Sequence, residues 1–418
     1  MEKIAAGENI IPTIQDAFNQ IENSSVNSKS ESNFKGLFND VKLDDTKLGN
    51  IEREREIKIK RIIQELSDIQ LTPNDHSIDF LGDVYEYLLS NFASNGGKKA
   101  GEFYTPESVS ELIVRIATHG RKSLKSVYDP ACGSGSLLIR ILKNAQTQNI
   151  KVQKLYGQEI KSSTFNLARM NLFLRGLTYF EFDIREGDTL IDPKHLNLDL
   201  KFDCVVANPP FSLKWNPNET LLNDERYNEY RVLPPRNKAD FAFLMHMLYN
   251  VHFEGVVVSI FSLGILERGN SEKKIRQVII DKNYIDAIIL MPERLFYNTI
   301  IATCIVIAKK NKKNDDILFI NASQEFKKSK KQNFLDENNI QKIYQTWAKR
   351  EEIPYFSKII SKKTIIENDY FLSVQKYVDN APDEEEIIDI EQVEKDILSV
   401  KNQIQELEEK FQKKSGWF

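Results

Sequence analysis

Hydrophobic residues recur along this chain with two different periods. Between Ile51 and Ile69, and again between Phe80 and Phe92, they fall three and four residues apart, which predicts two helices with an apolar face. Beyond residue 125 they gather in short Val- and Ile-rich runs that alternate with helical segments. That alternation is typical of a mostly parallel, doubly wound α/β sheet. We therefore predict a helical N-terminal domain over 1–75 and a sheet-containing domain over 76–380.

Individual elements follow from the same pattern. Residues 1–21 have a helical pattern, and residues 22–33 form a polar stretch that predicts a linker. The predicted strands are 126–128, 155–158, 179–184, 204–207, 256–261, 284–290 and 302–308. The predicted helices between them are 137–145, 162–174, 240–251 and 271–281.

The end of the chain has a pattern of its own. Apolar residues alternate at spacings of three and four at Ile390, Val393, Ile397, Val400, Ile404, Leu407 and Phe411. This heptad pattern predicts a coiled-coil-like helix within 381–418. Such a helix must pack on its own domain, on a second copy or on another subunit, and its length favours an intermolecular role.

Composition narrows the class of protein. With 41% hydrophobic and 28% charged residues, and no run long enough to span a membrane, the chain reads as a soluble globular protein. The start of the chain lacks the layout of a signal peptide. Three separated cysteines suggest a reducing cytoplasm, and five scattered histidines predict no bound metal. Residues 309–363 carry 14 Lys and Arg against 7 Asp and Glu, which suits either phosphate contacts or an ordinary solvated surface.

A glycine turn is the first candidate for chemistry. The segment Asp129-Pro-Ala-Cys-Gly-Ser-Gly-Ser136 joins a predicted strand to a predicted helix, and its glycines allow a ligand close to the backbone. It matches neither the dinucleotide fingerprint nor a phosphate loop. An acid at this place repels phosphate but suits S-adenosylmethionine, which has a sulfonium, an amine and a ribose. Glu159 and Asp188 follow the next two strands, where they can bind ribose hydroxyls and the adenine amino group.

Asn208-Pro-Pro-Phe211 is the second candidate. It follows a buried strand, and the two prolines end the strand's hydrogen bonding. An amide, a fixed carbonyl and an aromatic face can together hold a planar ring with an exocyclic amine. A plain Pro-rich turn is the alternative. The aromatic and arginine residues of the polar loop 212–237 can fill the gap left by an extruded base.

The loop before the glycine turn also carries aromatic residues. Thr105 is placed to cap a helix that Pro106 opens. Phe103 and Tyr104 can clamp a flat ligand ring there, or can act only as a hydrophobic staple.

Taken together, the Phe103-Tyr-Thr-Pro106, Asp129–Gly135 and Asn208–Phe211 motifs resemble those of the amino-group DNA methyltransferases, in particular the modification (M) subunits of type I restriction-modification systems. The resemblance covers residues 75–320 and the C-terminal helix. It implies a Rossmann-like S-adenosylmethionine-dependent methyltransferase sheet with a helical N-terminal part. The chain departs from the family in a short N-terminal part and in Phe261-Ser-Leu-Gly264.

The resemblance also assigns residues. It implies that Asn208, Pro209, Pro210 and Phe211 hold and activate the target base. The implied cofactor residues are Glu102, Phe103, Tyr104, Thr105, Pro106, Asp129, Gly133, Ser134, Gly135, Ser136, Glu159 and Asp188.

The implied activity is methyl transfer from S-adenosylmethionine to the N6 amine of a flipped adenine in double-stranded DNA. The implied partners are a specificity (S) subunit, a second M subunit and a restriction (R) subunit, with no membrane. Protein glutamine N5-methylation, which uses a related Asn-Pro-Pro motif, is the alternative enzyme. A scaffold that kept the fold without the chemistry is the non-enzymatic alternative.

Overall fold

The computed structural model describes residues 4, 8–67, 78–95, 105–196, 200–296, 300–329, 332–379, 398, 400–405 and 407. The chain divides into two compact units, Met1–Asp379 and Asn380–Phe418. In the second unit the described residues are helical, and Leu398, Val400, Ile404 and Leu407 are exposed. Among the described helices, none has both the length and the apolar character that crossing a membrane requires.

The helices of the first unit are α2 (Ile11–Asn23), α3 (Glu31–Phe34), α4 (Glu52–Ser67), α5 (Ile78–Asn95), α6 (Glu107–Thr118), α7 (Ser136–Thr147), α8 (Ser162–Leu174), α9 (Asp240–Asn250), α10 (Asn270–Asp281), α11 (Glu337–Lys349) and α12 (Lys362–Glu367). Short 3-10 helices are η2 (Glu219–Asn223), η3 (Asn228–Tyr230), η4 (Leu263–Leu266) and η5 (Val374–Lys376). Within the helix predicted for 1–21, the described residues are helical at Ile4 and again from Ile11 onwards, but not at 8–10. The predicted linker 22–33 contains the end of α2, turns and the start of α3.

The strands are β1 (Ser123–Leu124), β2 (Val127–Asp129), β3 (Lys151–Val152), β4 (Leu155–Glu159), β5 (Phe182–Glu186), β6 (Phe202–Ala207), β7 (Val251–Ser262), β8 (Ile285–Leu290), β9 (Thr303–Ala308), β10 (Asp316–Asn321), β11 (Lys327–Lys328), β12 (Asn333–Phe334) and β13 (Ser357–Ser361). Nine of them form one sheet in the order β13-β10-β8-β9-β7-β6-β2-β4-β5. The predicted mostly parallel sheet is confirmed, but β9 runs antiparallel between β7 and β8, and β13 is antiparallel to β10.

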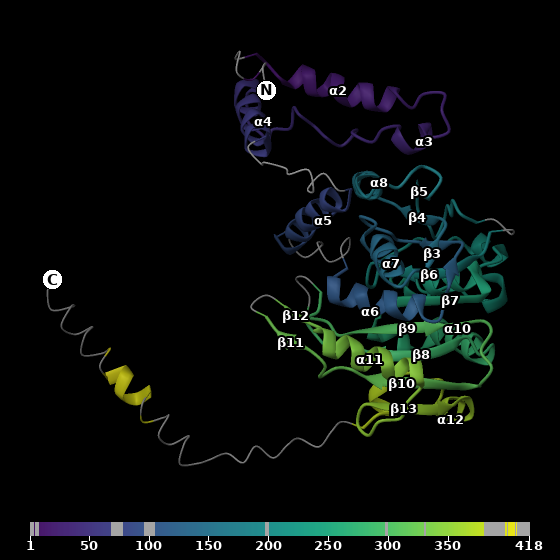
Figure 1. Ribbon diagram of the computed structural model, residues 1–418. Helices are drawn as coiled ribbons and strands as arrows, with labels where there is room; N and C mark the ends of the chain where they lie inside the picture. The colour runs from purple at the N-terminus through teal and green to yellow at the C-terminus, as the bar shows by residue number, and fades with distance from the viewer. Residues whose placement is uncertain are drawn as a thin grey trace. The chain divides into compact units, whose positions relative to one another are not determined.

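Both faces of the sheet are buried. On β6, Cys204 and Val206 pack into the core cluster that includes residues of α6, α7, α8 and α11. Val205 and Ala207 point the other way, into the cluster that includes residues of α9 and α10. Figure 1 shows these two helical layers on either side of the strands. A strand covered on both faces needs the continuous apolar run seen in the sequence.

The N-terminal helices are joined to this sheet domain by polar contacts. Arg169 of α8 is buried, and its guanidinium donates to the carbonyls of Asn33 and Lys35 at 2.9 and 3.0 Å. Tyr85 of α5 donates to the carbonyl of Leu167 at 3.3 Å. The boundary predicted near residue 75 lies outside the described residues, so the division into 1–75, 76–380 and 381–418 stays a prediction.

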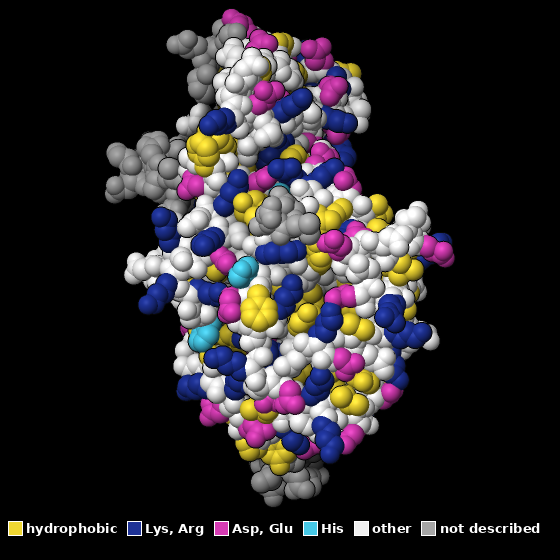
Figure 2. Space-filling model, turned by 90° about the vertical axis from the view of Figure 1, so that its right-hand side faces the viewer, with side chains coloured by type: hydrophobic (Ala, Val, Ile, Leu, Met, Phe, Trp, Pro, Cys, Tyr) yellow, Lys and Arg dark blue, Asp and Glu magenta, His cyan; other side chains and the backbone are white. Residues whose placement is uncertain are grey.

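The basic segment 309–363 does not form one free basic face. Lys309 and Arg350 pair with the buried Asp286 at 3.0 and 3.1 Å. Lys310 and Lys312 donate to the carbonyls of Val251 and Ile285. These four cations stabilise the fold, whereas Lys327 and Lys328 of β11 are exposed. On the face drawn in Figure 2, lysines and arginines lie among aspartates and glutamates.

Candidate active site

Three neighbouring strands end in polar residues at one edge of the sheet. Asp129 is the last residue of β2, Glu159 is the last of β4, and Asn208 directly follows β6. Because β4, β2 and β6 are adjacent and parallel, their carboxyl ends lie side by side. This edge is where ligands bind in open α/β sheets.

The glycine turn between β2 and α7 depends on its two glycines. Gly133 and Gly135 have φ values of 55° and 79°, and Gly135 is the N-cap of α7. Residues with a Cβ rarely adopt this left-handed conformation, which explains glycine at both positions. The hydroxyl groups of Ser134 and Ser136 lie 2.9 Å apart, and the Ser134 carbonyl accepts from Asn171 of α8 at 3.0 Å.

A small cleft brings the predicted residues together. Its lining combines Thr105, the glycine turn and Asn208, and consists of Thr105, Asp129, Ala131, Cys132, Gly133, Ser136, Leu137 and Asn208. Residue 208 therefore faces the mouth of the glycine turn, as the enzyme hypothesis requires.

Asn208 is oriented by one hydrogen bond and has one free acceptor. Its Nδ2 donates to the hydroxyl of Thr105 at 3.2 Å. Its Oδ1 is buried and has no hydrogen-bond partner among the described residues. A buried acceptor without a partner costs roughly 1–3 kcal/mol, so this oxygen is suited to a donor from a ligand.

Thr105 does not have the predicted capping role. The helix begins at Glu107, Pro106 is its N-cap with a ψ of 140°, and no side chain caps it. The Thr105 hydroxyl instead accepts from Asn208. The N–H groups of Val109 and Ser110 donate to the Pro106 carbonyl at 3.1 and 2.9 Å, so the first turn is held by backbone bonds. Glu102, Phe103 and Tyr104 lie outside the described residues.

The two buried acids have abnormal pKa values. Burial, with a smaller effect from Glu159, raises the pKa of Asp129 to about 8, against a hydrogen bond from the Ala131 N–H at 2.9 Å. Burial also raises the pKa of Glu159, whose two oxygens accept from the N–H groups of Gly133 and Lys161 at 3.1 and 2.9 Å. Buried carboxylates of this kind favour a cationic or hydroxyl-bearing ligand.

These features fit S-adenosylmethionine. A buried acid such as Asp129 suits a cationic ligand, the remaining lone pairs of Glu159 suit hydroxyl donors such as those of ribose, and the glycine turn leaves room for a ligand near its backbone. Asp188 accepts from the N–H of Leu190 at 2.9 Å, so its carboxylate is held by its own loop. Its predicted contact with adenine stays a prediction. Among the described residues no group of three or more His, Cys, Asp and Glu side chains gathers as a metal site.

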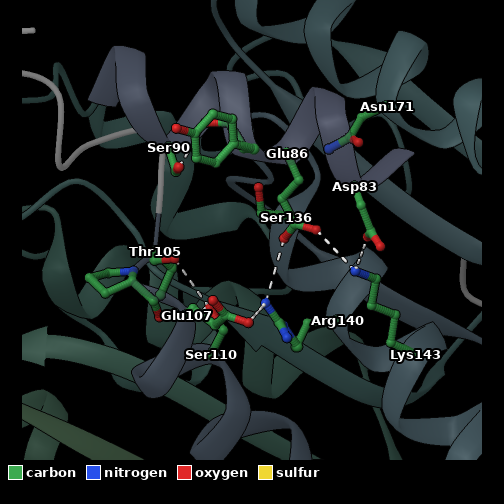
Figure 3. A network of polar contacts seen from close by, with 12 residues as sticks. Asp83, Glu86, Ser90, Thr105, Glu107, Ser110, Ser136, Arg140, Lys143 and Asn171 are labelled. Carbon is green, nitrogen blue, oxygen red and sulfur yellow. Dashed lines mark hydrogen bonds and ion pairs between the residues drawn. The ribbon is translucent and has the colours of Figure 1, made fainter. Parts of the chain in front are cut away.

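Polar contacts also fix the helices around the cleft. Arg140 of α7 pairs with Glu107 of α6 at 2.9 Å and with Glu86 of α5 at 3.7 Å. Lys143 of α7 pairs with Asp83 of α5 at 2.6 Å. Figure 3 shows how these side chains from three helices meet close to Thr105. The helix that follows the glycine turn is thereby tied to the helices on both sides of 96–104.

Phe211 lies beside the cleft residues and is only partly buried. Its ring meets Phe296 edge to face, with centroids 5.3 Å apart and an interplanar angle of 88°. Pro209 is buried and Pro210 partly buried.

The proposed use of the aromatics in loop 212–237 is wrong. Trp215, Tyr227 and Tyr230 are buried in the core rather than free to enter DNA. Trp215 donates its indole N–H to the carbonyl of Pro235 at 3.0 Å. Arg231 and Arg236 of the same loop are exposed. Sequence alone could not separate the two uses, because apolar residues in a long loop have no period.

Comparisons with known proteins agree with this geometry. The family model described as N-6 DNA Methylase matches residues 76–386. The chain belongs to the N-6 DNA methylase family. It is an adenine-specific DNA methyltransferase, and enzymes of this family use S-adenosylmethionine.

Relatives within the N-6 DNA methylase family are closely similar. The type I restriction enzyme MpnII methylase subunit of Mycoplasma pneumoniae is 38% identical over 392 residues, which cover 91% of this chain and 72% of that protein. The MjaVII methylase subunit of Methanocaldococcus jannaschii is 36% identical, but the match spans only 63% of its length. The crystal structure of a type I restriction-modification methyltransferase subunit from Streptococcus thermophilus is 36% identical, has a TM-score of 0.83, and is matched over 90% of this chain and 79% of that one. The protein glutamine methyltransferase alternative has no support among these relatives.

Proposed function

We propose that this N-6 DNA methylase is the modification subunit of a type I restriction-modification complex, with Asn208 as the residue that activates the target adenine. One observation supports this role most strongly. The Asn208 Oδ1 is buried and unpartnered among the described residues, in the same cleft as the glycine turn.

The chemistry needs an activated amine. The adenine N6 lone pair is delocalised into the ring, which makes it a poor nucleophile. Asn208 Oδ1 and the Pro209 carbonyl accept hydrogen bonds from the two N6–H groups. These hydrogen bonds favour a tetrahedral nitrogen with an available lone pair. The prolines keep both acceptors in place, so the dipoles are preorganised. Phe211, partly exposed beside them, stacks on the flipped base.

In this proposal the residues in and around the glycine turn would hold the cofactor. Bound S-adenosylmethionine supplies an electrophilic methyl group. Asp129 would hold its cationic portion, Glu159 its ribose and Asp188 its adenine amino group. The remaining positions carried over from the family that the structure describes are Thr105, Pro106, Gly133, Ser134, Gly135 and Ser136.

Replacing Asn208 tests the proposal. Asn208→Ala should reduce methyl transfer to adenine in DNA by about a thousandfold, because it removes an acceptor used in the transition state. The dissociation constant for S-adenosylmethionine should change by less than about threefold, since Asn208 faces the base. Tritiated methyl incorporation measures the first quantity and calorimetry the second.

Thr303→Val is the matched control. The Thr303 hydroxyl is also buried without a hydrogen-bond partner among the described residues, but it lies on β9 and is not one of the residues that line the cleft. That variant should keep normal activity. Full methyl transfer by Asn208→Ala, with the cofactor bound normally, contradicts the assignment.

The C-terminal unit supports a docking role. Its described apolar side chains at the heptad positions Val400, Ile404 and Leu407 are between 50% and 64% exposed. Such a stripe needs a partner surface. We assign this stripe to binding of the specificity subunit, which recognises the DNA target sequence. A second M subunit and a restriction subunit complete the complex on double-stranded DNA.

Charge placed on this stripe tests the assignment. Val400→Asp combined with Ile404→Asp should prevent co-elution with the specificity subunit on size exclusion, because both apolar contacts are lost. The exposed Asn402→Asp adds charge on the same helix and should leave assembly unchanged. Normal assembly of the double variant counts against this docking site.

A further inference from the structure

Arg226 is a buried arginine in the loop between the Asn208 motif and α9. It is 1% exposed, and all five of its N–H groups have acceptors. Nε and Nη2 donate to the Asp224 carboxylate at 3.0 and 2.7 Å. Nη1 donates to the Thr189 carbonyl at 2.8 Å and to His246 Nδ1 at 3.1 Å, and Nη2 also donates to the Leu190 carbonyl at 3.0 Å.

The two carbonyls that Arg226 binds come directly after Asp188. The Asp188 carboxylate accepts from the N–H of Leu190 at 2.9 Å, so the position of Leu190 sets the direction of that carboxylate. The Thr189 hydroxyl donates to the Pro130 carbonyl at 2.5 Å, next to Asp129. One guanidinium and one hydroxyl therefore join three segments, those after β2, β5 and β6.

The geometry suits arginine and no other side chain. A planar fork can reach two successive carbonyls and a carboxylate at the same time, whereas a lysine ammonium offers three donors from one point. Tyr227 completes the cluster, with its ring 4.8 Å from the guanidinium carbon and its hydroxyl 3.4 Å from the Leu190 carbonyl.

We propose that Arg226 is a positioning residue for cofactor binding: it fixes the segment 188–190, and through Thr189 the glycine turn, from the loop that follows the target-base motif. This inference rests on the proposed role of Asp188 and deepens it. The buried part of the loop 212–237 thus positions the segment 188–190, which is proposed to bind the adenosine part of the cofactor. The loop does not insert its aromatic residues into DNA.

Arg226→Lys is the test variant, and Arg276→Lys is its control. Arg276 on α10 is also 1% exposed and also donates to backbone carbonyls, those of Tyr370 at 2.7 Å and Arg268 at 2.9 Å. Its hydrogen bonds within the described part of the chain go to none of the segments named above. Both substitutions leave a buried carbonyl without its donor, so both lower the melting temperature.

The two variants should differ in cofactor affinity. By calorimetry with S-adenosylmethionine, Arg226→Lys should raise the dissociation constant about tenfold, the loss of roughly one charge-assisted hydrogen bond. Arg276→Lys should change it by less than about twofold. In steady state, Arg226→Lys should raise KM for the cofactor more than it lowers kcat. Without cofactor, hydrogen exchange should quicken at 188–192 in Arg226→Lys alone.

A second variant covers the case in which Arg226→Lys does not fold. Thr189→Val removes the link from the Thr189 hydroxyl to Pro130, together with its contact with Tyr128, and should weaken cofactor binding about threefold, as expected for a neutral hydrogen bond. Where both fold, their effects on affinity should be non-additive, since they act on one segment.

Equal affinity losses in the Arg226 and Arg276 variants, or an unchanged affinity in Thr189→Val, overturn the proposal. These binding measurements are independent of the substrate. A chain that binds the cofactor as described but does not methylate adenine contradicts the proposed function and leaves the positioning role intact.

Discussion

The two halves of the sheet treat buried charge in opposite ways. In the half formed by β5, β4, β2 and β6, Asp129 is 2% exposed and has no ion pair among the described residues. In the half formed by β7, β9, β8, β10 and β13, Asp286 is 5% exposed but contacts Lys309, Arg350 and the indole N–H of Trp347, all within 3.1 Å. The second half uses its buried acid to hold the fold together, whereas the first leaves its acid unpaired, in line with the cofactor-binding role proposed for Asp129.

Removing the paired acid should have the largest effect. Asp286→Asn leaves Lys309 and Arg350 without their buried partner and should lower the free energy of unfolding by about 3 kcal/mol. Affinity for S-adenosylmethionine should stay unchanged, because β8 does not reach the cleft. Urea unfolding and calorimetry measure the two quantities. A loss of affinity for S-adenosylmethionine with an unchanged free energy of unfolding would contradict the structural role of Asp286.

Removing the unpaired acid should give the opposite result. Asp129→Asn should weaken S-adenosylmethionine binding by an amount equivalent to roughly 1.5–3 kcal/mol, the range for a hydrogen bond to a charged group. Stability near pH 8 should not fall, because the neutral amide avoids the cost of a buried charge. The comparison fails if Asp129→Asn is strongly destabilised and binds the cofactor normally.

The pH dependence sharpens this contrast. Burial raises the pKa of Asp129 in the folded state to about 8, well above the unfolded value of about 3.9. Its contribution to stability is therefore complete below about pH 4 and is lost as the pH rises through about 8. Cofactor affinity should rise over the same interval, by up to about tenfold per pH unit, because a cation favours the ionised acid. Asp129→Asn should abolish both dependences; parallel titrations of the two proteins provide the comparison.

The β11–β12 hairpin, which follows β10 in the chain but forms a separate two-stranded sheet, should give the smallest effect. Asn333 of β12 donates to the carbonyls of Arg294 and Glu293 at 2.8 and 2.9 Å, close in the chain to Phe296, which contacts Phe211. Lys327→Glu combined with Lys328→Glu should remove about two phosphate contacts. The slope of log K for DNA binding against log salt concentration should then become shallower by about 1.8. Lys349→Glu on α11 is the control. An equal change of slope in that variant would show that the hairpin is not a specific DNA contact.

Local chemistry made much of the site predictable from the sequence. Asp129, Glu159 and Asn208 each follow a short apolar run, and parallel strands place such residues at one edge. The predicted strands at 155–158 and 204–207 and the helix at 162–174 match β4, β6 and α8 closely.

Long-range contacts account for what the sequence could not predict. Nothing in residues 303–308 distinguishes an antiparallel strand from a parallel one, because both read as a buried Val- and Ile-rich run. Arg226 has no pattern to mark it, since its acceptors at Thr189, Leu190 and His246 come from distant segments. Thr105 resembled a helix cap because Pro106 follows it. Its actual partner, Asn208, could not be recognised because it lies 103 residues away in the sequence.

The antiparallel strand β9 has a consequence for synthesis of the chain. It pairs with β7 on one side and β8 on the other, although both are made before it. Until residue 308 leaves the ribosome, two apolar strands keep open edges that face the same missing neighbour. Unpaired edges of this kind invite association between chains. Fragments that stop before Thr303 should therefore collect in inclusion bodies, whereas those that include Ala308 can fill the gap between β7 and β8.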